Sequence, residues 1–428
     1  MSDVSYPVRT SFWGTTSADP ISVLDGREEA DVVVVGGGLA GLSTAYHTAR
    51  LAPDLKIVLL EKEYAGYGAS GRNFCNVPQL ARADLSSLVR LLGPEGARYI
   101  VDHQAQMFED FQALIADESI DCEFQVVDLL HIAVHEEMVS GLRRMYEQHR
   151  EYSFPSELLD AEQTRKYVNE KVFGGLSCSR NGYAQPFKLS RGLREAALRR
   201  GVVIHEGSPL SRLSRNAASF VAETPGGSVE AKQCVFATNA YSPGIGVAKG
   251  VISPNYTYTI ATEPLDDEKF ELMGWHERHR LILDAGINHW DSQMRPNRQF
   301  LMGDAMHSSV SKDGVSLARH DDPAVYEGIQ AEMLKRFPFL EGTPLDCAWG
   351  GPLGMTESRY PVTGKIAEGL FLNGGYNGRG VLMASLSGRV LAPELAGVEV
   401  DDGYKRYADL LLHHGREAVQ ISTDGVTV

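Results

Sequence analysis

The chain has 428 residues, of which 43% are hydrophobic and 23% charged, so it is long enough to bury a full core in two or three domains. Its formal net charge of −15 argues against binding to nucleic acid or to an anionic membrane surface, because phosphates would be repelled. No apolar run approaches the ~20 residues that a membrane-spanning helix needs, and the N-terminus lacks the layout of a signal peptide, so we predict a cytoplasmic protein with no membrane span.

The five cysteines are scattered, odd in number and form no C-x-x-C motif: Cys75, Cys122, Cys178, Cys234 and Cys347. Such spacing is typical of reduced thiols in an intracellular protein and not of a disulfide framework or a zinc site. The histidines form no H-E-x-x-H motif. We therefore predict no metal site.

Residues 1–30 are polar and irregular, and the first regular unit follows them. The run Val32–Val35 is typical of a strand buried on both faces. Apolar residues then recur with helical spacing over 39–49, which predicts a helix. Gly36, Gly38 and Gly41 lie between and inside these elements at the positions of G-x-G-x-x-G. The first glycine permits a tight turn, the second lets a pyrophosphate approach the backbone, and the third lets helix and strand pack closely.

A second apolar run, 57–60, ends in Glu61, 25 residues after Gly36. An acidic residue about 20 residues downstream of the glycines is a suitable acceptor for a ribose hydroxyl. Strand, glycines, helix, strand and acid occur in the required order, so the sequence predicts a dinucleotide-binding unit. The alternative is a glycine-rich turn that serves only packing.

The middle of the chain alternates helical and extended patterns. A glycine-rich run at 66–73 is too small and polar to form a core element, and its backbone can lie close to a ligand. Helices are predicted at 84–118, 136–151, 158–167 and 189–200, the third opened by Asp160 and Gln163 in a partial capping box. Strands are predicted at 124–134 and 201–205, and a hairpin joins 219–224 to 228–235.

The last part of the chain has a second architecture and a second glycine-rich turn. Residues 251–320 alternate apolar and polar side chains, which predicts an antiparallel sheet, and a helix is predicted at 322–337. A strand at 369–372 then runs into the glycine-rich stretch 373–380 and a helix at 381–395. Since ligands bind at the carboxyl ends of strands, the two glycine-rich turns could meet one cofactor. The alternative is a surface turn shaped by glycines.

Four motifs therefore stand in order: VVVVGGGLAGLSTAYHTA with IVLLEK, GYGASGRN, CVFATNAYSP, and WGGPLGMTESRYPVTGKIAEGLFLNGGYNGRGVLMA. Together they closely resemble the D-amino acid oxidase (DAO) superfamily of FAD-dependent oxidoreductases, most of all the gamma-glutamylputrescine oxidase group. The resemblance implies an α/β fold with a Rossmann-like FAD-binding domain, split in sequence, and an inserted α+β substrate domain built on an antiparallel sheet.

The implied boundaries follow from the motifs. The N-terminal surface segment is 1–30; the FAD-binding domain is 31–83, 186–250 and 346–395; the substrate domain is 84–185 and 251–345; and a C-terminal helical tail is 396–428.

The resemblance implies FAD as the cofactor and assigns residues to each end of it. At the adenosine end it places Gly36, Gly38, Leu39, Ala40 and Gly41 at the pyrophosphate, Glu61 at the ribose, the Leu210 backbone at adenine, and Thr238 and Asn239 at the closing edge of the nucleotide site. Lys62, next to Glu61, is a further predicted cofactor-binding residue. At the flavin end it places Ser70, Gly71, Arg72 and Asn73 near the ring, and Gly375, Tyr376, Asn377, Gly378, Arg379 and Gly380 at its pyrimidine side and ribityl chain.

Departures from the family pattern bear on the substrate. Amino acid oxidases of the superfamily carry a carboxylate-binding arginine at a position that corresponds here to Leu353. The departure favours an amine, although Arg295, Arg298 or Arg379 could substitute. Relatives of sarcosine oxidase attach flavin through a cysteine where this chain has Gly351.

A covalent flavin is a separate alternative. Cys75 falls near a position that carries covalent flavin in relatives of dimethylglycine dehydrogenase. The other interpretation is an ordinary buried thiol.

The predicted chemistry is hydride transfer from the carbon that bears a small neutral amine to flavin N5, giving an imine that hydrolyses, with oxygen or another acceptor reoxidising the flavin. Catalytic candidates are Arg72, Tyr258, His289 and Trp349, with Tyr256 and Trp290 as further pocket residues. Two alternatives remain: an amino acid or N-methyl amino acid oxidase or dehydrogenase, and a flavoprotein subunit that needs a partner for turnover. The sequence predicts neither the substrate's identity nor the oligomeric state.

Overall fold

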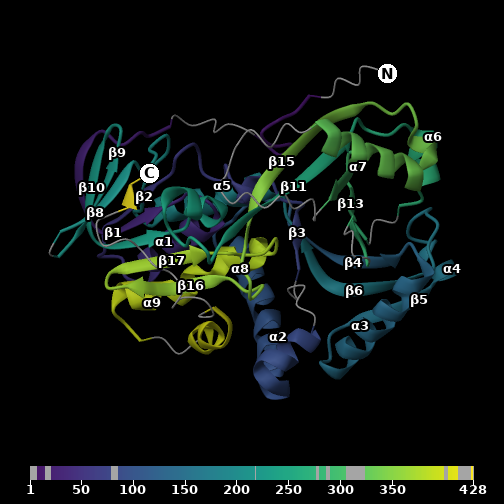
Figure 1. Cartoon of the computed structure of the whole chain (residues 1–428), viewed down its shortest axis with the longest axis horizontal. Helices are drawn as coiled ribbons and strands as arrows, with labels where there is room; N and C mark the ends of the chain where they lie inside the picture. Colours follow the sequence, from purple (N-terminus) through teal and green to yellow (C-terminus); the bar gives the residue numbers. More distant parts are fainter. Residues whose placement is uncertain are drawn as a thin grey trace.

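The fold is known from a computed structural model that describes residues 7–14, 21–78, 85–216, 218–275, 279–285, 290–304, 323–399, 403–412 and 426–427. The described strands form two sheets of nine strands each. In Figure 1 the strands of the first sheet lie at the left and those of the second at the right. The predicted α/β architecture with a second, mainly antiparallel sheet is therefore confirmed.

The first sheet is parallel at its centre. β1 (Gly26–Val35) lies between β2 (Ile57–Leu60) and β10 (Gly227–Phe236), and β7 (Val203–His205) and β17 (Leu370–Gly374) continue the parallel pairing on either side. Its antiparallel strands are β8 (Arg212–Arg215), β9 (Phe220–Thr224), β16 (Val362–Ala367) and β18 (Val426–Thr427). The predicted hairpin is the β9–β10 pair.

Both faces of this sheet are buried, as the four consecutive valines predict. Val32 and Val34 pack on one face against α1 (Leu39–Leu51) and its neighbouring helices, while Val33 and Val35 pack on the other face with residues of β8, β9 and β10. The helices of the first face are α2 (Leu85–Asp117), α5 (Pro186–Arg199), α8 (Gly380–Leu386) and α9 (Gly388–Ala396), with α10 (Tyr404–Tyr407) beside them.

The second sheet is antiparallel except at one pairing. Its strands are β3 (Asn76–Val77), β4 (Gln125–Ala133), β5 (Ser156–Asp160), β6 (Gly174–Tyr183), β11 (Ser253–Thr262), β12 (Leu281–Asp284), β13 (Trp290–Met294), β14 (Phe300–Asp304) and β15 (Leu345–Met355). The described strands of the segment 251–320 pair antiparallel with one another, as predicted, whereas β12 runs parallel to β4 from an earlier part of the chain. Helices α3 (Val139–Glu151), α4 (Ala161–Thr164), α6 (Asp267–Met273) and α7 (Pro323–Arg336) accompany this sheet.

Three predicted helices differ from the structure. The helix predicted at 84–118 is broken by a kink at Gly93, whose φ of 71° and ψ of 172° are not helical. The helix predicted at 381–395 is interrupted at Ser387, because Gly388 lies against α1: its N–H donates to Ser43 Oγ at 3.0 Å, and a Cβ at Gly388 would lie 2.1 Å from the Ser43 carbonyl oxygen. The helix predicted at 158–167 shortens to α4, because residues 158–160 pair with β6. The capping box of Asp160 and Gln163 is confirmed.

Short 3₁₀ or π turns connect the elements: η1 (Ala69–Gly71), η2 (Glu136–Met138), η3 (Asn239–Ile245), η5 (Pro338–Leu340) and η6 (Ala408–Leu412). In the described ranges, no helix has the length and apolar character needed to cross a membrane.

Candidate active site

The carboxyl ends of the central parallel strands open into a cavity of about 510 Å³. Both glycine-rich turns line it, although more than 300 residues separate them in the sequence. Fourteen of the predicted cofactor residues lie in its wall: Gly36, Gly38, Leu39, Ala40, Glu61, Lys62, Ser70, Asn73, Leu210, Thr238, Asn239, Tyr376, Gly378 and Gly380. The expected meeting of the two turns at one cavity is thus a feature of the fold.

The first turn needs its glycines for close backbone approach. Gly36 has φ of 110°, and a Cβ there would lie 2.7 Å from the carbonyl oxygen of Ala237 in the strand-end segment after β10. A Cβ at Gly41 would lie 1.9 Å from the carbonyl oxygen of Gly36. Gly41 is not among the cavity-lining residues, and it shapes the cavity by letting α1 start directly on the end of β1.

Glu61 lies where β2 ends and closes one side of the cavity. Its Oε2 accepts the N–H of Gly37 at 2.6 Å and its Oε1 accepts the N–H of Glu63 at 2.9 Å. Burial raises the pKa of this carboxyl above its usual range. Each carboxylate oxygen has a second lone pair, so the side chain can still accept a hydrogen bond from a hydroxyl group of a ligand.

The 66–73 segment is held against the start of α1. Ser70 Oγ accepts the N–H of Leu39 at 2.9 Å, and the Asn73 amide donates to the Ser70 carbonyl at 2.9 Å. Gly71 lies behind this wall, because a Cβ there would meet the Gly66 carbonyl oxygen at 2.3 Å. Ser70 and Asn73 therefore face the cavity, whereas Gly71 supports the turn.

The second glycine-rich turn, after β17, is hydrogen-bonded to the segment that follows β10, the strand that pairs with β17. Asn239, with φ of 45°, accepts the N–H of Gly375 at 2.9 Å through its side-chain oxygen. The Asn377 side chain accepts the N–H of Thr356 at 2.8 Å, and Arg379 stands at the N-cap of α8. Gly375, Asn377 and Arg379 are absent from the cavity wall, so these three predicted residues hold the turn in shape without lining it.

A smaller pocket adjoins the large cavity and shares three of its wall residues, Ala69, Asn73 and Leu353. Arg72 lies in its wall and is only 6% exposed. Its Nε donates to the Tyr67 carbonyl at 2.7 Å, one terminal nitrogen donates to the Gly350 carbonyl at 3.3 Å, and the guanidinium lies 4.4 Å from the centre of the Tyr67 ring. The cation is therefore fixed in position beside the cavity.

Trp349 also lines the smaller pocket, and its indole N–H donates to the Arg72 carbonyl at 3.0 Å. The structure thus brings together two of the four catalytic candidates, Arg72 and Trp349. The third, His289, lies outside the described residues.

Tyr258 does not line either pocket. It is buried on the opposite face of β11, where its ring lies 5.6 Å from that of Tyr326 on α7. Thr257 and Thr259, its neighbours in the strand, line the smaller pocket instead. Successive side chains of a strand point to opposite faces, so the aromatic residues fill the core while the threonines face the pocket. Sequence reasoning missed both threonines, and the alternation of β11 was the signal that could have found them.

The arginines considered as substitutes for a carboxylate-binding arginine have other partners. Arg295 lies 4.6 Å from the centre of the Trp13 ring and 3.9 Å from the Glu123 carboxylate, and Arg298 pairs with Asp267. Neither arginine lines the smaller pocket, and Trp290, at the start of β13, does not line it either.

The cysteines are all buried and free. Cys75 lies in a hydrophobic cluster with Trp13 and Trp349, burial raises the pKa of its thiol, and it lines neither pocket. Cys347 belongs to the same cluster. Across the described ranges, no three His, Cys, Asp or Glu side chains gather in a way that could bind a metal ion.

The residues of the large cavity suit a dinucleotide with a flavin. The backbone lines the cavity at Gly36 and Gly38 beside the start of α1, where a pyrophosphate can meet the positive end of the helix dipole. The wall also includes Gly378 and Gly380, and the adjoining smaller pocket holds the fixed cation of Arg72.

Comparison with known proteins agrees with this geometry. The family model described as FAD dependent oxidoreductase (DAO) matches residues 31–393. Gamma-glutamylputrescine oxidoreductase of Escherichia coli is 28% identical over 91% of this chain and 89% of its own length, and the probable oxidoreductase OrdL of Haemophilus influenzae is 26% identical over 86% and 84%. The crystal structure of glycine oxidase from Geobacillus kaustophilus is similar in fold, with a TM-score of 0.69 at 19% identity over 87% of this chain and 96% of that one.

Proposed function

The chain belongs to the DAO family of FAD-dependent oxidoreductases, and we propose that it oxidises a carbon–nitrogen bond of a small amine. Similarity over most of the chain to a gamma-glutamylputrescine oxidoreductase supports an amine as the substrate class. The predicted division into an FAD-binding domain and a substrate domain is part of this proposal, with the first sheet in the former and most of the second in the latter.

In this proposal the large cavity holds FAD along its length. The turn at Gly36 and Gly38 takes the pyrophosphate and Glu61 takes a ribose hydroxyl. The wall formed by Ser70, Asn73, Tyr376, Gly378 and Gly380 takes the flavin end. Support comes from the backbone exposed at the glycines and from the acceptor capacity of the Glu61 carboxylate. Four further predicted residues do not line the cavity but fix the backbone that touches the cofactor: Gly41, Gly71, Gly375 and Asn377.

Bound FAD would supply the hydride acceptor for the carbon that bears the amine, and the imine product would hydrolyse in water. The protein's own residues bind the amine and orient it toward the cofactor. The Arg72 guanidinium supplies a fixed positive charge beside the cavity, which stabilises negative charge developing there. The hydroxyls of Thr257 and Thr259 can hydrogen-bond the amine, and Trp349 forms an apolar wall that excludes water.

One observation carries the preference for an amine over an amino acid. The smaller pocket has a leucine, Leu353, at the position that corresponds to the family's carboxylate-binding arginine. Arg72, the charged residue among its described wall residues, already donates to two backbone carbonyls. A bidentate clamp for a carboxylate is therefore missing from the described wall of this pocket.

Anaerobic titration of the purified holoenzyme tests the proposal. We expect small amines and polyamines to bleach the visible flavin band and amino acids to leave it. Bleaching by amino acids or N-methyl amino acids alone would favour the second alternative. A flavin that no compound reduces without another protein would favour a subunit that needs a partner. Oxygen or another acceptor as oxidant, and a cytoplasmic location, stay predictions.

A further inference from the structure

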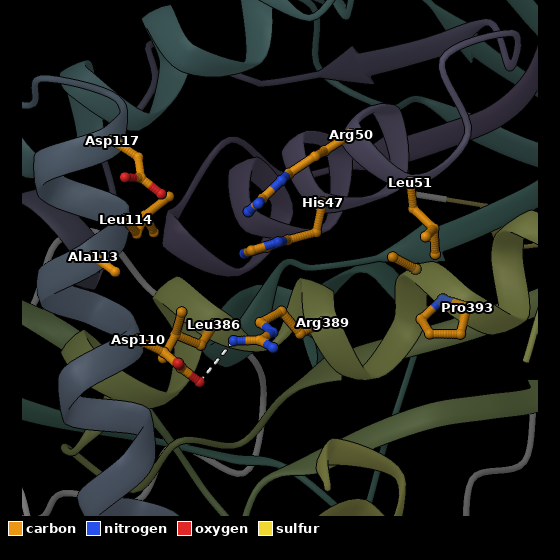
Figure 2. A pocket seen from close by; sticks show the side chains of 11 residues that line it. His47, Arg50, Leu51, Asp110, Ala113, Leu114, Asp117, Leu386, Arg389 and Pro393 are labelled. Carbon is orange, nitrogen blue, oxygen red and sulfur yellow. Dashed lines mark hydrogen bonds and ion pairs between the residues drawn. The ribbon is translucent and has the colours of Figure 1, made fainter. Parts of the chain in front are cut away.

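A second pocket of about 410 Å³ lies away from the cofactor cavity, between α1, α2 and the α8–α9 pair. Figure 2 shows His47 and Arg50 entering it from α1, Asp117 from α2 and Arg389 from α9. Its volume is in the range of small-molecule sites. It shares no wall residue with the cofactor cavity.

His47 is 93% buried by its 7% exposure, and its Nε2 has no hydrogen-bond partner. The other ring nitrogen bonds the backbone carbonyl of Ser385 in α8. Burial, then the charges of Arg389 and Arg50, lower the pKa of His47 to about 3, so the ring is neutral at pH 7. With its proton on the nitrogen that bonds Ser385, the ring presents Nε2 to the pocket as a hydrogen-bond acceptor.

Some of the remaining polar side chains of the pocket are paired within the protein, and others can bind a ligand. Arg389 forms an ion pair with Asp110 at 2.6 Å, and Asp110 also accepts the Tyr404 hydroxyl at 2.8 Å, so these two charges compensate each other. The side chains of Arg50 and Asp117 are on exposed residues and make no hydrogen bond or ion pair with any residue that the structure describes. In Figure 2 the Arg50 side chain lies over the His47 ring, and Asp117 lies across from them on α2.

The pocket therefore offers a donor cation at Arg50, and two acceptors at His47 Nε2 and Asp117. A simple anion would satisfy Arg50 but would face the lone pair of His47 and the charge of Asp117. A simple cation would satisfy the acceptors but would be repelled by Arg50. A molecule with both charges meets all three groups.

We propose that this pocket binds a small zwitterion of the amino-acid class, whose ammonium donates to His47 Nε2 and Asp117 and whose carboxylate accepts from Arg50. The site is separate from the proposed reaction site, so its existence does not depend on the proposed substrate. The C-terminal ends of α1 and α8 contribute to the wall of this pocket, and the N-terminal ends of the same two helices line the cofactor cavity.

Calorimetry and histidine-labelled NMR of the FAD-loaded enzyme test the proposal. The ligands are glycine, L-alanine and γ-aminobutyrate, compared with succinate, putrescine and inorganic phosphate. The resonances of His47, one of 13 histidines, are assigned by their loss in His47→Gln. We expect at least one zwitterion to bind and to move the Nε2 resonance of His47, while the single-charge ligands leave it in place.

Two substitutions and two matched controls locate the binding. Arg50→Gln and Asp117→Asn should each weaken zwitterion binding about tenfold or more, the loss expected when a charge-assisted hydrogen bond is removed. Arg143→Gln on α3 and Asp102→Asn on α2 alter exposed residues elsewhere and should change affinity less than twofold. The flavin spectrum separates the sites, because ligands in the reaction site perturb it and should do so equally in the Arg50→Gln enzyme.

Three results would overturn the proposal. One is that no zwitterion moves the His47 resonance, which would make the pocket a solvent-filled recess. Another is that phosphate or succinate binds as well as the zwitterions, which would make it a plain anion site. The third is that affinity is indifferent to Arg50 and Asp117.

Discussion

Replacing Gly41 by alanine should separate the first helix from the first strand. The added Cβ would lie 1.9 Å from the Gly36 carbonyl oxygen, roughly 1.5 Å short of ordinary contact. That oxygen belongs to a turn whose own φ is 110° and whose Cβ position already faces Ala237, so it has little room to retreat. We expect a loss of unfolding free energy of about 3 kcal/mol and a loss of FAD retention.

The assay is denaturant unfolding of the purified enzyme, together with the ratio of visible flavin to protein absorbance. Gly328→Ala is the matched control, because this glycine lies in α7 with nothing within 4 Å of its Cβ position. The control should be neutral or stabilising by up to about 1 kcal/mol. A Gly41→Ala enzyme that keeps wild-type stability and flavin content would show that the junction of β1 and α1 does not depend on the close approach of Gly41 to Gly36.

Three further predictions follow from the site and its surroundings. Arg72→Ala should slow flavin reduction about tenfold or more while weakening FAD binding less, because Arg72 lines the smaller pocket and not the larger cavity; stopped-flow reduction at the wild-type rate would contradict this. Acid precipitation should release all yellow colour, since Cys75 is buried outside both pockets, and a yellow pellet would show a covalent link. Burial raises the pKa of Glu118, but hydrogen bonds from Tyr46, Arg200 and Arg199 outweigh it and lower the pKa to about 2. The Glu118 carboxylate therefore contributes its full stabilisation of the folded state above pH 4.5, and this contribution is lost as the pH falls toward 2. Glu118→Gln should cost about 1–2 kcal/mol of unfolding free energy at pH 7 and little near pH 2, whereas an equal loss at both pH values would contradict the assignment.

The parallel unit and its glycine turn were predictable because their physics is local. Four consecutive valines bury both faces of β1, and the glycine spacing follows from a turn that must start a helix at once. What the sequence could not show depends on distant partners. The interruption at Ser387 exists because Gly388, the first residue of α9, packs against Ser43 of α1. The parallel pairing of β12 with β4 joins segments about 150 residues apart.

The candidate site shows the same division. The residues whose backbone touches the cavity were found from motifs, but the residues one layer behind it were not distinguished from them. Gly375 and Asn377 hold the second turn through Asn239 and Thr356, contacts that exist only once β10, β15 and β17 are assembled. Tyr258 was predicted as a pocket residue because it is aromatic, but its side chain is buried in the core, and the neighbouring threonines face the pocket.

β6 was missed for a related reason. Its sequence GGLSCSRNGY is polar and glycine-rich, yet eight of its ten residues are buried between strand neighbours. Pairing with β4, β5 and β3 determines this strand, and its own composition does not.

The most direct test of the central claim is anaerobic reduction of the purified enzyme, followed at the visible flavin band. We expect the protein to carry FAD, and we expect a small amine, without any partner protein, to bleach the flavin completely while the matching amino acid does not. A colourless protein that takes up no FAD would contradict the assignment of the cavity. A flavin bleached by amino acids and not by amines would contradict the assignment of the smaller pocket.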